Sequence, residues 1–178
     1  MFAPSVSLRT TTLADRDFLL RVYASTRAAE LAQTGWDATA CESFVQMQFN
    51  AQSGHYRQQW PASVHFVIEA LLNGLTHQVG RLWLDHRASE THVLDIALLP
   101  EWCGCGIGSA CFRQQMREAS HAGKALTIQV EQGNPARRLY DRLGFVPVGA
   151  QQGLHQLMSW RGRARAHLPL EEACYEQT

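Results

Sequence analysis

The chain has 178 residues, a length that suits one well-packed domain and is short for two. Its hydrophobic share of 46% and charged share of 18% are typical of a globular protein, and no uninterrupted apolar run approaches membrane-spanning length. Basic and acidic residues number 16 each, so the formal net charge is zero, and we expect neither nucleic acid nor a membrane as the main partner.

The amino-terminal third is predicted to hold one short strand and two helices. Val6–Arg9 alternates apolar and polar residues, as a half-buried strand does. Thr12–Asp15 matches a capping box, in which a hydroxyl and a carboxylate satisfy free amides at a helix start. We therefore expect a helix over Leu13–Gln33, broken at Gly35, and a second, glutamine-rich helix over Ala38–Gln59.

Three strands are predicted next. Val64–Glu69, Gln78–Asp85 and His92–Leu99 are rich in branched and aromatic residues. Asn73-Gly74 is a strong signal for a tight hairpin turn between the first two of them. Pro100 is expected to end the third strand.

The carboxy-terminal part begins with the segment WCGCGIGS, residues 102–109, followed by a predicted helix over Ile107–Ala122 and a strand over Ala125–Glu131. Asn134-Pro135 is typical of a helix start, with Asn as the cap and Pro at the first helical position. One face of this helix carries Ala136, Leu139, Tyr140 and Leu143, and Gly144 is its expected C-cap. Phe145–Val148 and Leu154–Trp160 are predicted as closing strands. Together these elements predict one α/β domain.

The five cysteines give no regular disulfide framework; they are Cys41, Cys103, Cys105, Cys111 and Cys174. An odd number of irregularly spaced cysteines favours reduced thiols and a cytoplasmic location. The start of the chain, MFAPS, also lacks the basic and apolar regions of a signal peptide.

The glycine segment raises two chemical alternatives, a metal site and an anion site. Zinc sites usually draw ligands from two separated pairs, whereas Cys103 and Cys105 form one Cys-x-Cys pair. Cys111 shares a helix face with Ile107, so we expect it to pack in the core. A metal site is therefore disfavoured. The order strand, glycine loop, helix aims unpaired backbone amides at an anion, and the helix dipole adds positive potential there. The segment nevertheless lacks the context of a Rossmann loop and the Gly-Lys-Ser/Thr of a P-loop.

Two stretches resemble the conserved blocks of the GNAT superfamily of N-acetyltransferases. They are LDIALLPEWCGCGIGSACF, residues 94–112, and NPARRLYDRLGF, residues 134–145. The resemblance extends over the order of elements from about Val6 to Trp160. It implies an α/β (α+β type) fold with a central mixed, mostly antiparallel twisted sheet of about six to seven strands and about four helices. We expect this GNAT-like domain to occupy residues 1–160, followed by a basic-then-acidic tail over residues 161–178.

The resemblance implies transfer of an acetyl group from acetyl-CoA to a primary amine of a small molecule or peptide, by direct attack in a ternary complex. The residues that match the superfamily's cofactor-binding positions are Ile96, Ala97, Leu98, Cys103, Gly104, Cys105, Gly106, Ile107, Gly108, Ser109, Asn134 and Tyr140. Many members form dimers, so a homodimer is among the assemblies that the resemblance implies. The alternative is a catalytically silent acyl-CoA-binding regulatory module.

The loop departs from the superfamily pattern at two positions. Cys103 replaces the usual Gln or Arg, and Cys105 replaces a residue that is often basic. The departures remove charge near the pyrophosphate position, which favours the silent alternative. The three arginines of the neighbouring helix, Arg137, Arg138 and Arg142, are candidates to replace that charge.

Tyr140 matches the tyrosine that hydrogen-bonds or protonates the departing thiolate in the superfamily, and it is our first catalytic candidate. Asp95 is the second, as a general base, because alternation with Val93 and Ala97 suggests a buried carboxylate near the loop. Other candidate bases are Glu69, Glu131, Glu30 and an ordered water. The expected acceptor pocket lies under the first two helices, with Trp36, Asp37, Gln48, Gln52 and Tyr56 as candidate lining residues.

Overall fold

Seven strands form a single sheet in the computed structural model, which describes residues 5–151 and 153–162. Their order across the sheet is β1-β2-β3-β4-β5-β7-β6, and β4–β5 is the parallel pair among antiparallel neighbours. The strands are β1 Ser5–Thr10, β2 Val64–Leu72, β3 Leu75–His86, β4 Glu90–Leu98, β5 Ala125–Glu131, β6 Val146–Pro147 and β7 His155–Arg161. The predicted fold class is confirmed.

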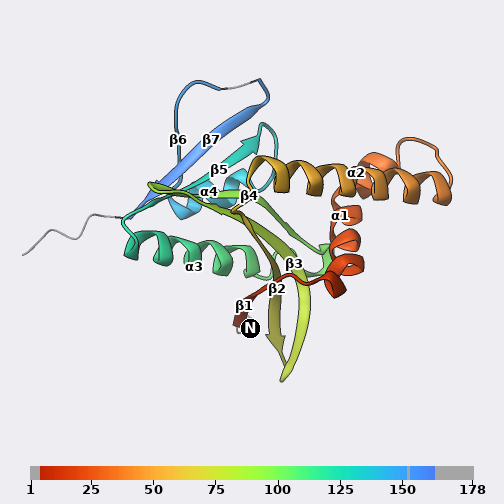
Figure 1. Cartoon of the computed structure of the whole chain (residues 1–178), viewed down its shortest axis with the longest axis horizontal. Helices are drawn as coiled ribbons and strands as arrows, with labels where there is room; N and C mark the ends of the chain where they lie inside the picture. The colour runs from red at the N-terminus through yellow and green to blue at the C-terminus, as the bar shows by residue number, and fades with distance from the viewer. Residues whose placement is uncertain (1–4, 152, 163–178) are drawn as a thin grey trace, which may run out of the picture.

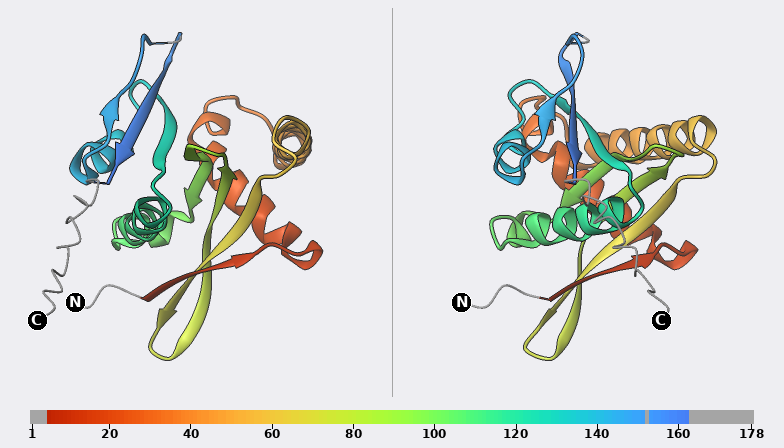
Figure 2. Two further views of the ribbon diagram at one scale, coloured as in Figure 1. Left: turned by 60° about the vertical axis from the view of Figure 1, so that its left-hand side comes forward. Right: turned by 90° about the vertical axis from the view of Figure 1, so that its left-hand side faces the viewer.

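Helices cover both faces of this sheet (Figure 1). They are the 3-10 turn η1 Leu13–Asp15, α1 Arg16–Leu31, α2 Ala38–Gln59, the 3-10 turn η2 Pro100–Trp102, α3 Ile107–His121 and α4 Arg137–Leu143. Figure 2 shows α1 and α2 on one side of the sheet and α3 and α4 on the other. The two pairs of helices therefore create two separate environments on the two faces.

Local sequence signals set most element boundaries. The Asn73-Gly74 turn has left-handed φ angles of 52° and 78°, and Leu72 pairs with Leu75 as expected for a two-residue hairpin. The prediction for α4 was wrong at its start. The Asn134 side chain accepts a hydrogen bond from the Ala136 amide at 2.9 Å and so caps a turn, and the helix begins two residues after Pro135.

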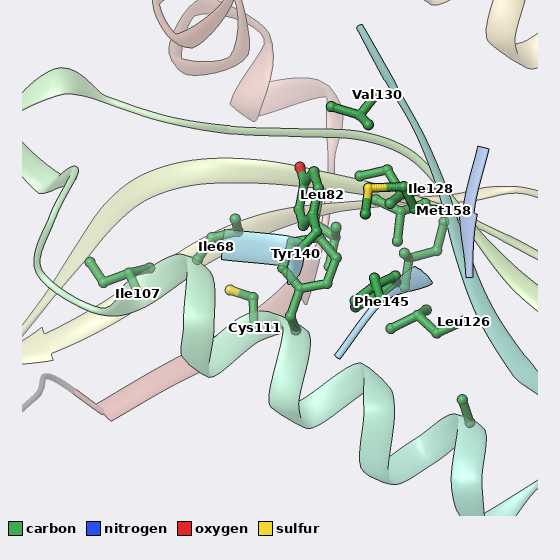
Figure 3. Close-up of a cluster of buried hydrophobic side chains, with 14 of the residues drawn as sticks. Ile68, Leu82, Ile107, Cys111, Leu126, Ile128, Val130, Tyr140, Phe145 and Met158 are labelled. Atoms are coloured by element: carbon green, nitrogen blue, oxygen red, sulfur yellow. The ribbon is translucent and has the colours of Figure 1, made fainter. Parts of the chain in front are cut away.

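Two hydrophobic clusters fill the two faces. The larger lies under α3 and α4 and includes Ile107, Cys111, Leu126, Tyr140 and Phe145, all almost fully buried (Figure 3). The burial of Cys111 confirms its predicted packing role. The smaller cluster joins α1 and α2 to the sheet through Phe18, Leu19, Val22, Tyr23, Val45, Phe49, Val67 and Leu99.

Strands β4 and β5 separate after a short stretch of pairing. They pair over Glu90–Val93 and Ala125–Ile128, and β5 then continues alongside β7 as far as Glu131. The remaining part of β4 has β3 on one edge, and no strand among the described residues pairs with the other. A β-bulge falls at the same point, because Trp83 pairs with Asp95 and Leu84 with Val93, which leaves Leu94 extra.

The end of the predicted domain is close to the end of the sheet. β7 continues through Arg161, one residue beyond the predicted boundary, and the predicted tail from residue 163 onward lies outside the described residues. Among the helices of the described part, none is both long and apolar enough to span a membrane.

Candidate active site

The glycine loop presents a row of unpaired amides. Gly104 and Gly106 have left-handed φ angles of 77° and 82°, and Gly106 is the N-cap of α3 without any side-chain cap. The amides of residues 104–109 form no hydrogen bond with the backbone of a described residue. A Cβ added at Gly104 or Gly106 would meet no atom within 4 Å. The loop is therefore open toward a ligand, and its amides point to an anion.

The third glycine serves packing between helices. A Cβ at Gly108 would lie 3.4 Å from Leu139 of α4, so the start of α3 packs closely against α4. The Cys103 thiol lies 3.5 Å from the Leu99 carbonyl oxygen, and both Cys103 and Cys105 are exposed and free. Their side chains thus flank the loop, while the open space lies over its glycines.

The bulge in β4 changes the predicted orientation of Asp95. Val93, Ile96 and Leu98 pack in the cluster under α3 and α4, whereas Ala97 packs in the cluster under α1 and α2. Asp95 shares the second face with Ala97 and contacts Arg81 there. The predicted alternation with Val93 was wrong, because the extra residue at the bulge moves every later side chain of β4 to the opposite face.

Asp95 belongs to a buried ion pair that the sequence analysis did not anticipate. The Arg81 Nε and Asp95 Oδ2 atoms are 2.7 Å apart, but the N–H is not aligned with the oxygen, so the contact is an ion pair without a well-formed hydrogen bond. The Arg81 side chain is 3% exposed and that of Asp95 is 19% exposed. Arg81 also donates to the Gln52 Oε1 atom at 3.1 Å and stacks over the Tyr23 ring.

Tyr56 of α2 lies next to this pair. Its hydroxyl donates to the bulged Leu94 carbonyl oxygen at 3.4 Å, and its ring packs edge-on against Trp83. Burial, and secondarily the negative charge of Asp95, raises the pKa of Tyr56. We call Tyr23, Gln52, Tyr56, Arg81 and Asp95 the polar cluster. Gln52 and Tyr56 were predicted to line the acceptor pocket; in the structure Gln52 contacts Arg81, and Tyr56 lies close enough to Asp95 to feel its charge.

Tyr140 approaches the same region from the opposite face. It is 3% exposed and packs against Phe112 and Phe145, with ring centroids 5.1 and 5.9 Å apart (Figure 3). Burial, with a smaller contribution from the negative charge of Asp95, raises the pKa of Tyr140 to about 12. The two predicted catalytic residues are therefore electrostatic neighbours near the point where β4 leaves β5.

The other candidate bases lie elsewhere. Glu69 forms an ion pair with Arg9 at 2.9 Å, at the β1 side of the sheet. Glu30 is exposed near the end of α1, where it pairs with Arg27, and Glu131 is exposed at the end of β5. The structure thus brings only Asp95, among the side chains predicted as bases, into the polar cluster.

The remaining predicted acceptor residues have structural roles. Asp37 is the N-cap of α2 and accepts from the Ala40 amide at 2.8 Å. Trp36 is half exposed and packs edge-on against Phe44, while Gln48 accepts a hydrogen bond from the Tyr23 hydroxyl at 3.0 Å. Among the described residues, no group of three or more His, Cys, Asp or Glu side chains could hold a metal ion.

Sequence reasoning missed Arg81, Tyr23 and Trp83. Arg81 carried a usable signal, because it stands alone as a cation inside the apolar strand segment VGRLWL and a buried cation requires a partner. The identity of that partner depends on strand register and could not be derived from the same signal.

Comparisons with known proteins agree with this geometry. Residues 61–147 match the family model described as an acetyltransferase (GNAT) domain. The chain is 31% identical over 87 residues to the [ribosomal protein bS18]-alanine N-acetyltransferase of Haemophilus influenzae. That match covers 48% of this chain and 57% of the relative, so the chain spans little more than half the length of the curated relative.

Solved structures show the same fold at low identity. The PaiA N-acetyltransferase of Thermoplasma acidophilum, crystallised with coenzyme A, superposes with a TM-score of 0.64 at 16% identity, covering 89% of this chain and 99% of that one. The ribosomal-protein-S18-alanine N-acetyltransferase of Escherichia coli gives a TM-score of 0.57 at 17% identity, covering 88% and 94%.

Proposed function

We propose that this chain, which matches the acetyltransferase (GNAT) domain over residues 61–147, transfers an acetyl group from acetyl-CoA to a primary amine by direct attack within a ternary complex. The observation that carries this proposal is the row of unpaired amides at residues 104–109, next to the open edge of β4. These two features supply what an acyl-CoA requires, a cradle for its phosphates and backbone groups along its chain.

The residues present fit the cofactor. Acetyl-CoA supplies an activated acyl thioester, and the loop holds its pyrophosphate through the amides at the start of α3. Open space over Gly104 and Gly106 allows close approach of the backbone to a phosphate. Cys103 and Cys105 contribute no positive charge, so amides and the helix dipole provide the electrostatic attraction. Asn134, as the cap of the turn before α4, is proposed to reach the cofactor from the next element.

The open edge of β4 is proposed to stabilise the reacting carbonyl. Ile96, Ala97 and Leu98 follow the bulge, where no strand in the described part of the chain pairs with the edge that faced β5. Backbone amides on this edge are fixed by the sheet before any ligand arrives. Preorganised donors of this kind contribute about 3 to 4 kcal/mol in acyl transfer.

Tyr140 is proposed to donate a hydrogen bond to the departing sulfur rather than to transfer its proton fully. Its pKa of about 12 lies well above the roughly 8.5 of a thiol, so complete transfer would be uphill by about 5 kcal/mol. A protonated phenol held by Phe112 and Phe145 is a fixed donor at neutral pH.

The amine acceptor is proposed to approach along the polar cluster. An aliphatic ammonium must lose its proton before attack, which costs about 4 to 5 kcal/mol at pH 7. Asp95 has one oxygen in contact with Arg81 and a partly exposed side chain, so its second oxygen can accept a hydrogen bond from the amine. Gln52 and Tyr56 lie beside it and can orient the acceptor.

A peptide amine is the acceptor class that the curated relative supports. That relative is named for an alanine of a ribosomal protein, so a peptide with a free terminal amine is the first acceptor to test. We further propose a cytoplasmic site of action, in which the exposed thiols of Cys103 and Cys105 stay reduced.

Incubation with acetyl-CoA and a panel of peptide and small amines, followed by measurement of released thiol, tests the activity. We expect thiol release that depends on one acceptor class. Tight CoA binding with no release across the panel would instead identify a silent binding module.

Tyr140→Phe tests the proposed hydrogen-bond donor. Turnover should fall tenfold or more because the donor to the sulfur is lost, while the dissociation constant for CoA stays within twofold. Tyr56→Phe is the matched control on the acceptor side, and it should change the KM for the amine more than the affinity for CoA. Unchanged turnover in Tyr140→Phe would refute the role assigned to the phenol.

A further inference from the structure

A cavity lies on the α1/α2 face, beside a different stripe of α2 from the one that carries Gln52 and Tyr56. It has a volume of about 310 Å³ and lies between the β1–α1 connection, the start of α1, the second half of α2 and β2. Its polar and charged lining consists of Thr11, Thr12, Arg16, Asn50, Ser53, Arg57 and His65. None of the described residues that line it carries a carboxylate.

The cavity and the polar cluster lie on neighbouring faces of α2. Phe49, Ser53 and Arg57 follow one stripe of the helix and line the cavity, whereas Gln52 and Tyr56 follow the adjacent stripe toward Arg81 and Asp95. None of the five residues of the polar cluster lines the cavity, so the cavity is not an extension of the site proposed for the amine.

Two arginines at the cavity lack a counter-charge. Arg16 donates to the neutral Asn50 side chain at 3.2 Å, and neither Arg16 nor Arg57 forms an ion pair with a described residue. The nearby Asp15 does not serve this purpose, because its carboxylate is held by Arg9 at 2.8 Å and by the Thr12 amide at 2.7 Å. The cavity thus has an excess of positive charge.

Ser53 provides an independent indication of a ligand. Its side chain lines the cavity and is only 9% exposed, and its hydroxyl forms no hydrogen bond with any other side chain or backbone group that the structure describes. The hydroxyl is not fully enclosed and has no partner among these groups, so it is available to a molecule in the cavity.

The apolar residues of the lining limit the kind of molecule that can bind in the cavity. Leu19 and Phe49 are buried at the inner wall, and Leu13 at the cavity is 96% exposed. The floor is His65, whose ring stacks on Trp83 with centroids 4.2 Å apart. Burial and the nearby Arg81 and Arg57 lower the pKa of His65 to about 3, so the floor is neutral at physiological pH and does not add to the positive charge.

We propose that this cavity binds a small organic anion, with its carboxylate or phosphate group between Arg16 and Arg57 and its apolar body against Leu13, Leu19 and Phe49. The volume is at the lower end of the range for small-molecule sites and suits an anionic group on a body of several carbon atoms. Guanidinium groups recognise both carboxylate and phosphate oxygens, and the Ser53 hydroxyl adds a third donor.

The experiment uses the full chain saturated with CoA, so that the loop amides do not compete for the probes. Benzoate, phenyl phosphate and inorganic phosphate are titrated while the imidazole NMR signal of His65, assigned by its loss in His65→Gln, is followed. Binding of benzoate or phenyl phosphate should shift the His65 signal, and the preferred probe identifies the anionic group.

Arg57→Gln and Arg16→Gln should each weaken binding of that probe tenfold or more, because each removes a charge-assisted contact. Arg21→Gln is the matched control on the same face of the molecule; Arg21 lies on α1 but lines a different groove, and its loss should leave the affinity unchanged. Equal binding by wild type and both variants, or binding without a shift of the His65 signal, would overturn the proposal.

Discussion

The two faces of the sheet are built on different principles. The face under α3 and α4 is packed almost entirely with apolar side chains, and Tyr140 brings the single phenol into its buried cluster. The face under α1 and α2 contains a buried arginine, its carboxylate partner and two tyrosines beside a much smaller apolar cluster. Both faces meet near the point where β4 parts from β5.

The difference follows from what each face is proposed to hold. On the α3/α4 side the ligand contacts come from backbone amides, which need a rigid apolar support and no particular side-chain chemistry. On the α1/α2 side an amine must be recognised and deprotonated, which requires polar side chains at fixed positions. Polarity is therefore concentrated on the face where side chains do the chemistry.

Arg81→Met would disturb the polar face most strongly. It leaves Asp95 without its counter-charge in a site where the carboxylate is only 19% exposed, so we expect a loss of about 3 to 5 kcal/mol in the free energy of unfolding. Urea denaturation measures this loss in the free energy of unfolding. The double variant Arg81→Met/Asp95→Leu should recover part of the loss, since it replaces the pair by apolar groups. If the loss in the double variant equalled the sum of the losses in Arg81→Met and Asp95→Leu, the two residues would not be energetically coupled.

Gly80→Ala tests whether the two faces are coupled through β4. A Cβ at Gly80 would lie 2.3 Å from the Ala97 carbonyl oxygen and 2.7 Å from the Leu98 side chain, so β4 must shift where we place the carbonyl-binding amides. We expect about 1 to 3 kcal/mol of destabilisation and weaker CoA binding, measured by denaturation and calorimetry. Gly54→Ala is the control, because a Cβ there meets nothing within 4 Å. If CoA affinity were the same in Gly80→Ala, the backbone amides on the open edge of β4 would not be involved.

His65 gives the polar face its own dependence on pH. The folded protein keeps His65 neutral down to a pKa of about 3, whereas the unfolded chain protonates it near 6.5. Between these values the unfolded state binds more protons, so stability decreases as the pH falls, by up to about 1.4 kcal/mol for each pH unit. His65→Gln should reduce this slope between pH 6 and 4.

His121→Gln, a change at an exposed histidine at the end of α3, is the control for the loss of an imidazole as such. If the slope of unfolding free energy against pH were identical in wild type and His65→Gln, protonation of the His65 imidazole would not destabilise the folded protein.

Predictability from sequence also differed between the two faces. The helix α2 was predicted with its observed bounds, and short contiguous motifs led to the glycine loop and to Tyr140. Both predictions were possible because caps, turns and glycine conformations depend on the local sequence. The Arg81–Asp95 pair depends on the register of β3 against β4, and the orientation of Asp95 depends on one extra residue at Leu94. Neither has a local signature, so the face where side chains act was the harder one to predict.

Cys105→Arg tests whether the loop side really relies on backbone groups alone. The side chain at residue 105 is exposed beside the unpaired amides, so a guanidinium there can reach a phosphate without disturbing packing. We expect a gain of about 1 kcal/mol, roughly fivefold in the dissociation constant for CoA, and the gain should shrink at high salt because the contact is exposed. Cys105→Ser should have no effect on affinity. If serine weakened binding, the thiol itself would contribute, and the loop would share the side-chain dependence of the opposite face.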